Sequence, residues 1–281
     1  MATDDLMKFR TAYLRSIALS WADEDFKRQL VSDSTSAIDV MQRYLGFDWP
    51  WPNACTLKFK SVPKFQWICD EWVWPLHLSD HLTLYVPLDP SVYVKGETQD
   101  PPTKLPADQR AMALADFYRQ RSALFSDGWG EGWGNTGSQL EVSIKGAEGP
   151  ASPSPAGGFY PDSSEFAAFQ VALLAAIAKA WDDQEFRSLL TIDANTALRK
   201  VRGYELPWKM TLAIADDADA RWHPPLFTGP MTTPLLSHWS FSRPNELTLN
   251  LPSKPGELQS EPVALAMYNG TGAAYPFSCT C

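Results

Sequence analysis

Residues 21–27 read WADEDFK, and residues 181–187 read WDDQEFR, 160 positions later. Large apolar residues on either side keep the same offset: Phe9, Ile17, Trp21, Phe26 and Leu30 recur as Phe169, Ile177, Trp181, Phe186 and Leu190. Spacings of four and eight residues place most of them on one face of an amphipathic helix. We therefore predict helices over residues 6–31 and 165–190.

The repeat continues beyond these helices. Further segments match in the same order: 46–51 (GFDWPW) with 203–208 (GYELPW), 56–57 with 211–212, 82–87 (LTLYVP) with 247–252 (LTLNLP), and 113–115 with 264–266. Because the order is kept and the offset changes only between elements, chance similarity is a poor explanation. We predict an α+β protein of two tandem repeats, each with a helix hairpin, a small antiparallel sheet and a C-terminal helix.

The segment between the two copies has the composition of a linker. Residues 149–158 read GPASPSPAGG, and such residues favour flexible connections over packed structure. We divide the chain into a first repeat at 6–125, a linker at 126–160, a second repeat at 161–269 and a flexible tail at 270–281.

Each long helix is followed by a shorter one with recognisable ends. In the first copy it covers residues 34–45, with Ser34 or Ser36 as the N-cap and Gly46 after its last residue. In the second copy, residues 195–202 are likewise followed by a glycine.

Alternating polar and apolar residues then predict strands at 56–60, 81–87, 211–214 and 246–251. The first copy also carries an aromatic-rich insert, residues 65–74, without a recognisable match in the second copy. We expect this insert to cover the sheet, and an exposed surface for a partner is the alternative. A third helix is predicted at 107–125, and its match in the second copy breaks off at Gly270.

Composition excludes several classes of function. The net charge is −9 and the pI about 4.9, so no basic surface is available for nucleic acid. No apolar run reaches the length of a membrane span, and the first residues lack the basic start and apolar core of a signal peptide. We expect a cytoplasmic protein that binds neither nucleic acid nor membrane. Four cysteines are too few for a disulfide scaffold at 281 residues.

The sequence holds no HExxH, GxSxG, P-loop or paired CxxC motif. His77 and His81 lie four residues apart, but in a strand this spacing separates them by ~13 Å, so we expect ordinary surface histidines.

The duplication helps to sort the cysteines. Cys55 matches Met210, so that position suits a soft apolar side chain and we expect Cys55 in the core. Cys69 falls within the aromatic insert, and its role stays open. Cys279 and Cys281 have no counterpart in the first copy and follow a glycine- and alanine-rich run.

These motifs together resemble a known family. The pattern is an alanine-rich helix, W-x-D-x-x-F-[KR]-x-x-L, a short helix, G-[FY]-[DE]-x-P, and a strand ending in L-x-[VL]-P. It resembles the N-terminal segment of the nitrile hydratase alpha subunit, which also occurs as the leader of bacterial precursors, the nitrile-hydratase-like leader peptides. The resemblance covers residues 9–90 and 166–255, and the chain looks like the tandem-duplicated branch among bacteriocin precursors called thiazole/oxazole-modified microcins (TOMMs).

The resemblance implies a ribosomally synthesised and post-translationally modified peptide (RiPP) precursor, which is not an enzyme and carries no cofactor. Its leader would recruit modifying enzymes to a core, here Ser278, Cys279, Thr280 and Cys281. The implied partners are a YcaO-type cyclodehydratase or an iron-dependent oxidase, with a protease and an exporter for the product. In cyclodehydration, Cys279 attacks the carbonyl of Ser278 and Cys281 that of Thr280, and thiols react before hydroxyls.

A second interpretation leaves the tail thiols unmodified. Cys279 and Cys281 form a Cys-x-Cys pair that suits redox chemistry or a soft metal such as copper or zinc, with further ligands from a second chain. Nitrile hydratase activity is excluded, because that enzyme's metal claw resembles C-x-x-C-S-C whereas residues 276–281 read PFSCTC.

Overall fold

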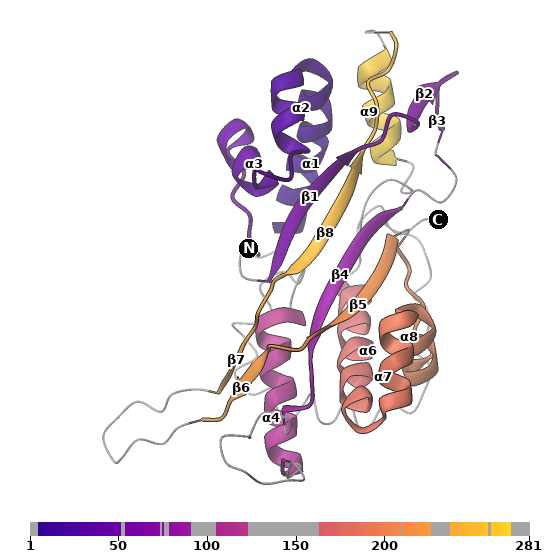
Figure 1. Ribbon diagram of the computed structural model, residues 1–281. Helices are drawn as coiled ribbons and strands as arrows, with labels where there is room; N and C mark the ends of the chain where they lie inside the picture. Colours follow the sequence, from indigo (N-terminus) through magenta and orange to yellow (C-terminus); the bar gives the residue numbers. More distant parts are fainter. Residues whose placement is uncertain are drawn as a thin grey trace.

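The computed structural model describes residues 5–51, 54–73, 75, 79–90, 105–122, 163–208, 210–225, 237–257 and 260–270. Within these residues the chain is a mixed α+β protein in which helices flank one four-stranded sheet and two short hairpins (Figure 1). We refer to residues 6–125 as the first half and to residues 161–269 as the second half.

Three helices open each half. They are α1 (Asp5–Ala22), α2 (Glu24–Leu30) and α3 (Ala37–Leu45), followed in the second half by α6 (Ser163–Asp182), α7 (Gln184–Ile192) and α8 (Ala194–Arg202). The predicted continuous helices over 6–31 and 165–190 are wrong, because each is divided at an aspartate. Asp23 and Asp183 have extended backbones, and their carboxylates accept the N–H groups of Phe26 and Phe186. A carboxylate in this N-cap position starts a new helix.

The short helices end as their sequences predict. Gly46 and Gly203 adopt the left-handed conformation, with φ of 64° and 65°, and each donates its backbone N–H to the preceding turn. A left-handed residue closes a helix at little cost only when it is glycine. Ser36, one of the two predicted caps, accepts the N–H of Asp39 and is the N-cap of α3.

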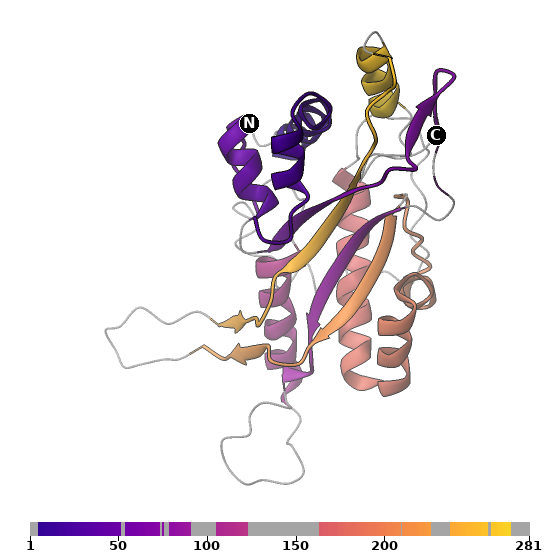
Figure 2. The same ribbon diagram turned by 45° about the horizontal axis from the view of Figure 1, so that its top comes forward.

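The central sheet contains strands from both halves. Its members are β1 (Cys55–Ser61), β4 (Asp80–Pro87), β5 (Met210–Asp217) and β8 (Asn245–Leu251), in the order β1-β8-β4-β5. Strand β8 lies parallel to β1 and antiparallel to β4, and β5 lies parallel to β4. The prediction of a separate antiparallel sheet in each half is therefore wrong. Figure 2 shows α1–α3 beside β1 at one edge of the sheet and α6–α8 beside β5 at the other.

The pairing follows a two-fold pattern. Cys55 lies opposite Asn245 in the β1–β8 pair, and Met210 lies opposite Asp80 in the β5–β4 pair. Cys55 and Met210 are the matched residues described above, 155 positions apart. Their partners, Asp80 and Asn245, are 165 positions apart, which is the offset of the matched segments 82–87 and 247–252. The two halves thus contribute corresponding residues to corresponding places.

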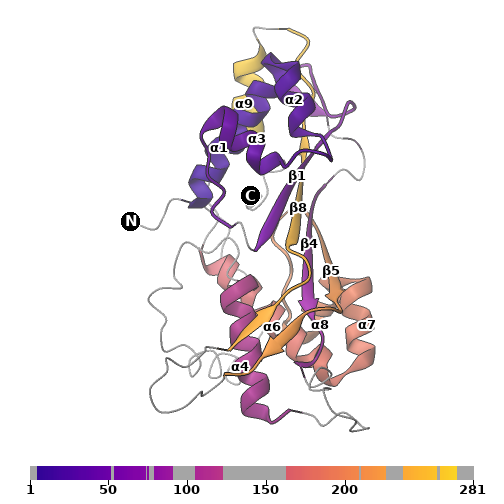
Figure 3. The same ribbon diagram turned by 60° about the vertical axis from the view of Figure 1, so that its left-hand side comes forward.

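The third helices are exchanged in the same way. Helix α9 (Glu261–Gly270) packs on α1 and β3 of the first half, whereas α4 (Ala107–Phe117), which continues into η2 (Tyr118–Ser122), packs on β7 and α6 of the second. We call α1–α3, the β2–β3 hairpin and α9 the first lobe, and α6–α8, the β6–β7 hairpin and α4 the second lobe. Figures 1 and 3 show the lobes at opposite ends of the sheet.

The predicted aromatic insert is a hairpin, β2 (Gln66–Ile68) with β3 (Glu71–Val73). The second half has an equivalent hairpin, β6 (Arg221–His223) with β7 (His238–Ser240), so the insert is not unique to the first half. Trp67 faces Trp72 in one hairpin and Trp222 faces Trp239 in the other. Phe65 and Trp72 are buried and pack against α1 and α9.

Candidate modification segment and its anchoring helix

The predicted modification residues, Ser278, Cys279, Thr280 and Cys281, lie outside the described residues. The last described element is α9, which ends at Gly270, eight residues before Ser278. The described part of the candidate site therefore consists of α9 and the residues that contact it.

A chain of hydroxyl groups holds α9 against α1 and β8. The hydroxyl of Tyr13 donates a hydrogen bond to the backbone carbonyl of Asn250 at 3.3 Å, and it lies 2.7 Å from the hydroxyl of Tyr268. Because the proton of Tyr13 is used for Asn250, Tyr268 is the donor to Tyr13. Both tyrosines are almost fully buried, where a hydrogen bond fixes position more strongly than it does in water.

The β2–β3 hairpin holds the same helix from another side. The indole nitrogen of Trp72 donates to the carbonyl of Ala264 at 2.8 Å. The ring of Trp72 also packs edge-on against Phe65 and Tyr268, and stacks on Trp21 of α1. Such aromatic pairs add to the free energy gained by burial. Helix α9, which precedes the candidate segment, is thus held by residues of the first half.

The second lobe holds its third helix by the matching bond, from the indole nitrogen of Trp239 to the carbonyl of Ala113 at 2.7 Å, and by an arginine in addition. Helix α4 continues into η2, where Arg121 donates to the carbonyls of Ala54 and Arg243 at 3.2 and 2.8 Å and stacks on Phe241. The residue matching Arg121 in the second half is Gly272, at the offset of 151 found for the third helices. Glycine has no side chain with which to make such contacts.

The comparison with known families decides the class. The model of a family described as "Ribosomal natural product, two-chain TOMM family" matches residues 4–125 and 164–276. The chain belongs to this family. The resemblance to TOMM precursors is therefore confirmed. No curated protein and no solved structure matches the chain.

The two described cysteines of this TOMM-family chain differ in environment. Cys55, predicted in the core, is fully buried in β1, and burial raises the pKa of its thiol. Cys69 is exposed at the turn of the β2–β3 hairpin and has a φ of 51°, with Asp70 at 61°. A thiol that stays protonated is a poor nucleophile, so Cys55 is structural.

A buried carboxyl group lies at the junction of the two halves. Asp80 of β4 accepts hydrogen bonds from the backbone N–H and the side-chain amide of Asn250, at 2.8 and 3.1 Å. Burial raises the pKa of Asp80 to about 7, although the bonds from Asn250 act in the opposite direction. The corresponding position of β8 is Asn245, which accepts the N–H of Tyr85 at 2.9 Å. The TOMM-family chain thus has an acid in one half and an amide in the other.

The described histidines do not form a metal centre. His81 is exposed in β4, as predicted, and His77 lies outside the described residues. His223 and His238 stack across the β6–β7 hairpin with ring centroids 4.7 Å apart. Among the described residues no group of three or more His, Cys, Asp or Glu side chains could hold a metal ion. Nor does any helix in this part of the chain have the length and apolar character needed to cross a membrane.

Sequence reasoning did not find Tyr13 and Tyr268 as the anchor of α9. In the second lobe their matched positions are Leu173 and Phe117, both buried. A change from apolar residues in one lobe to two tyrosines at the matched positions of the other lobe was the available signal. This signal could be interpreted only with the structure, in which α9 packs on the first half and brings Tyr13 and Tyr268 together across 255 positions of sequence.

Proposed function

We propose that this chain is a RiPP precursor of the TOMM class, in which the folded residues recruit modifying enzymes and Ser278, Cys279, Thr280 and Cys281 are the substrate. Membership of the TOMM family supports this role. The observation that carries it is the position of α9, which is firmly anchored and ends eight residues before Ser278. A folded domain would thereby hold a short reactive sequence at a defined distance from an enzyme.

The chemistry at these residues would be heterocycle formation by a cyclodehydratase. The sulfur of Cys279 adds to the carbonyl carbon of Ser278, and the sulfur of Cys281 adds to that of Thr280. In each ring the carbonyl oxygen leaves as water with the thiol proton and the amide proton, and a C=N bond closes a thiazoline. The cysteines would react first, because sulfur is the better nucleophile.

We further infer that the two halves are copies of one leader-like unit. The matched tryptophans Trp21 and Trp181, which bond to the matched prolines Pro252 and Pro87, support this inference. So do the matched N-caps Asp23 and Asp183. The precursor would meet its enzymes in the cytoplasm, and a protease and an exporter would act on the modified product.

The test is the intact mass of the chain after co-expression with the cyclodehydratase of its TOMM pathway. We expect the loss of one water per ring, mapped by fragmentation to residues 278–281. Replacing Cys279 and Cys281 together with alanine should abolish this loss. An unchanged mass, or a loss that persists in the C279A/C281A variant, would refute the assignment. A mass change other than loss of water would also refute heterocycle formation; co-expression with an iron-dependent oxidase in place of the cyclodehydratase tests the other modification.

A further inference from the structure

Strand pairing at the centre of the sheet relates the two halves by a two-fold axis. In the antiparallel β4–β8 pair (Figure 1), Leu82 lies opposite Leu247, its own match at the offset of 165. The pairs on either side are each other's matches in reverse order, His81 with Thr248 and Thr83 with Glu246. A contact that recurs with its partners interchanged is typical of an isologous interface, as in a symmetric dimer.

Hydrogen bonds between the halves follow the same rule. Trp72 of the first half donates to the carbonyl of Ala264 in the second half at 2.8 Å. In the reciprocal bond, Trp239 of the second half donates to the carbonyl of Ala113 in the first half at 2.7 Å. These bonds and the strand pairs lie within the two halves, so a cut between residues 126 and 160 removes none of them. The halves are thus arranged as the two subunits of a dimer, joined in one chain.

Some matched contacts differ in chemistry, and these differences decide which halves can pair. The hydroxyls of Tyr13 and Tyr268 lie 2.7 Å apart, whereas the matched residues Leu173 and Phe117 are apolar. A pair of two second halves would place Leu173 against Tyr268 on both sides of the axis. Each buried Tyr268 hydroxyl would then lose its bond to Tyr13, and a buried polar group that loses a partner costs free energy. This contact therefore disfavours a pair of two second halves.

The buried carboxyl group of Asp80 disfavours the opposite combination. It accepts both the backbone N–H and the side-chain amide of Asn250, at 2.8 and 3.1 Å. In the matched contact, Asn245 accepts the backbone N–H of Tyr85. A pair of two first halves would place Asp80 against Tyr85, which has no side-chain amide. Each buried carboxyl group would then lose one donor, so this contact disfavours a pair of two first halves.

An ion pair adds to the preference for unlike halves. Lys58 of β1 reaches Glu246 of β8 at 2.6 Å, and the matched residues are Ala213 and His81. Two first halves would bring Lys58 to His81. Two second halves would leave Glu246 facing Ala213. Neither combination brings opposite charges together. Because both partners of the ion pair are partly exposed, it contributes less than the two buried contacts.

We infer that the two halves are a selective pair that does not need the covalent link: as separate chains, each half binds the other in preference to a copy of itself. The interface consists of β4, β8 and the exchanged third helices. Its polar contacts impose a cost on both like pairs, which is what discrimination between partners requires. The partner that the first half accepts is a second unit of this family that carries the amide of Asn250 and the hydroxyl of Tyr268. The inference is independent of the chemistry at residues 278–281.

The test starts from the intact, folded chain. A specific protease site is inserted between Gly157 and Gly158, and the purified chain is cut there and examined by native mass spectrometry. We expect the two fragments to stay together as a one-to-one complex. Fragments that separate at micromolar concentration would overturn the inference, because the pairing would then depend on the link.

Selectivity is measured by unfolding the cut chain in urea and refolding it by dilution, with the uncut chain as the control for refolding. Random pairing would make like pairs together as frequent as unlike pairs, and we expect unlike pairs to exceed like pairs about tenfold. Like pairs that are as frequent as unlike pairs would overturn the inference. So would aggregation of the cut chain under conditions in which the uncut chain refolds.

Two variants of the cut chain test whether the named contacts select the partner. D80N removes the buried carboxyl group and should raise the share of pairs of two first halves about threefold. Y268F removes the buried hydroxyl and should raise the share of pairs of two second halves by about the same factor. D39N and Y44F make the same chemical changes at exposed positions of α3 and should leave the distribution unchanged. If D80N and Y268F change the distribution no more than these controls, the inference fails.

Discussion

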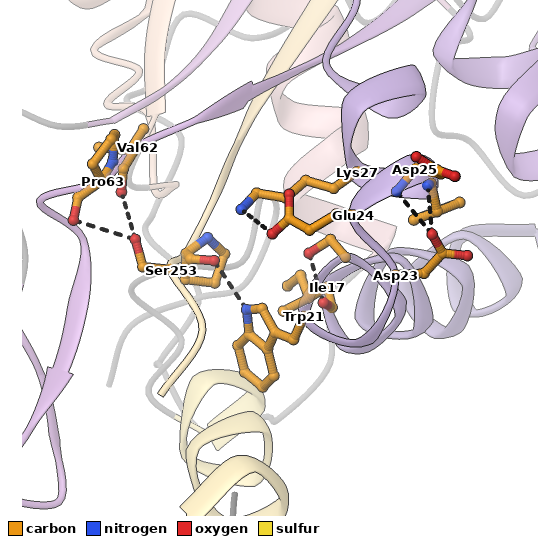
Figure 4. Close-up of polar contacts among 12 residues, drawn as sticks. Ile17, Trp21, Asp23, Glu24, Asp25, Lys27, Val62, Pro63 and Ser253 are labelled. Atoms are coloured by element: carbon orange, nitrogen blue, oxygen red, sulfur yellow. Dashed lines mark hydrogen bonds and ion pairs between the residues drawn. The ribbon is translucent and has the colours of Figure 1, made fainter. Parts of the chain in front are cut away.

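The indole nitrogen of Trp21 in α1 donates a hydrogen bond to the backbone carbonyl of Pro252 at the end of β8, over a distance of 3.0 Å and a separation of 231 residues. Figure 4 shows the indole pointing toward the backbone next to Ser253, whose hydroxyl donates to the carbonyls of Val62 and Pro63. The matched Trp181 makes the same bond to Pro87, at 3.1 Å. Each half thus fastens the last strand of the other, and neither half has its full set of contacts alone.

Replacing Trp21 with phenylalanine should destabilise the chain by about 2–3 kcal/mol, because a buried hydrogen bond and part of a buried ring are lost. Trp181 is less buried, so the matched variant W181F should cost about 1 kcal/mol. Urea unfolding followed by circular dichroism measures both. A W21F variant as stable as wild type would show that the packing of β8 against the first half does not depend on this contact.

The tyrosine pair predicts unequal effects of two similar substitutions. Y13F removes the bonds to Asn250 and to Tyr268, whereas Y268F removes the bond to Tyr13 and leaves the bond from Tyr13 to Asn250 in place. We expect losses of about 2 and about 1 kcal/mol in the free energy of unfolding. The double variant should lose less than the sum, because the two changes share a bond. Additive losses in this double-mutant cycle would contradict the hydroxyl chain.

The buried Asp80 predicts a pH dependence of stability. Its pKa is raised to about 7 in the folded chain, against an ordinary value of 3.8. Between these values unfolding releases a proton, so the stability falls as the pH rises and the loss is complete above about 7. We expect D80N to remove this fall and to be more stable than wild type at pH 8 by about 2–4 kcal/mol.

Asn245 supplies the matched control for Asp80. The variant N245D places a carboxyl group at the corresponding buried position, so it should destabilise the chain more at pH 8 than at pH 4. Urea midpoints at a series of pH values measure both variants. If the free energy of unfolding of the wild-type chain rises from pH 4 to pH 8, and that of D80N changes by the same amount, the raised pKa of Asp80 would be refuted.

Thiol labelling separates the two described cysteines. In a C279A/C281A background we expect iodoacetamide to add once to the native chain, at Cys69, because that residue is exposed and Cys55 is buried with a raised pKa. A second adduct should form only after unfolding in urea. Peptide mapping that finds native labelling at Cys55 would contradict the described core.

Local structure was largely predictable from the sequence. The glycines after the short helices, the four main strands and the core position of Cys55 follow from local patterns, because each depends on residues close in sequence. The breaks at Asp23 and Asp183 were missed, since the apolar stripe continues across them. Aspartate is a preferred N-cap residue, and the acidic residues that follow it in both halves, Glu24 and Asp25 in one and Glu185 in the other, are a further signal that could have revealed the breaks.

The exchange of strands and helices could not be predicted in the same way. The two halves carry the same strand patterns, so alternation alone cannot say whether β4 pairs with the first strand of its own half or with that of the other. The β6–β7 hairpin was missed because residues 224–237 separate its strands, whereas residues 69–70 separate those of β2–β3. The pairing of Trp222 with Trp239 becomes recognisable only when the structure brings these residues together.

The central claim is that the folded part delivers residues 278–281 to a cyclodehydratase, and one comparison tests it most directly. The full chain and a synthetic peptide of residues 271–281 are offered to the same enzyme at equal concentration, and loss of water is followed by mass spectrometry. We expect the full chain to be modified at Cys279 and Cys281 while the peptide stays largely unmodified. A peptide that is modified as fast as the full chain would contradict the claim, because the folded domain would then contribute nothing to recognition.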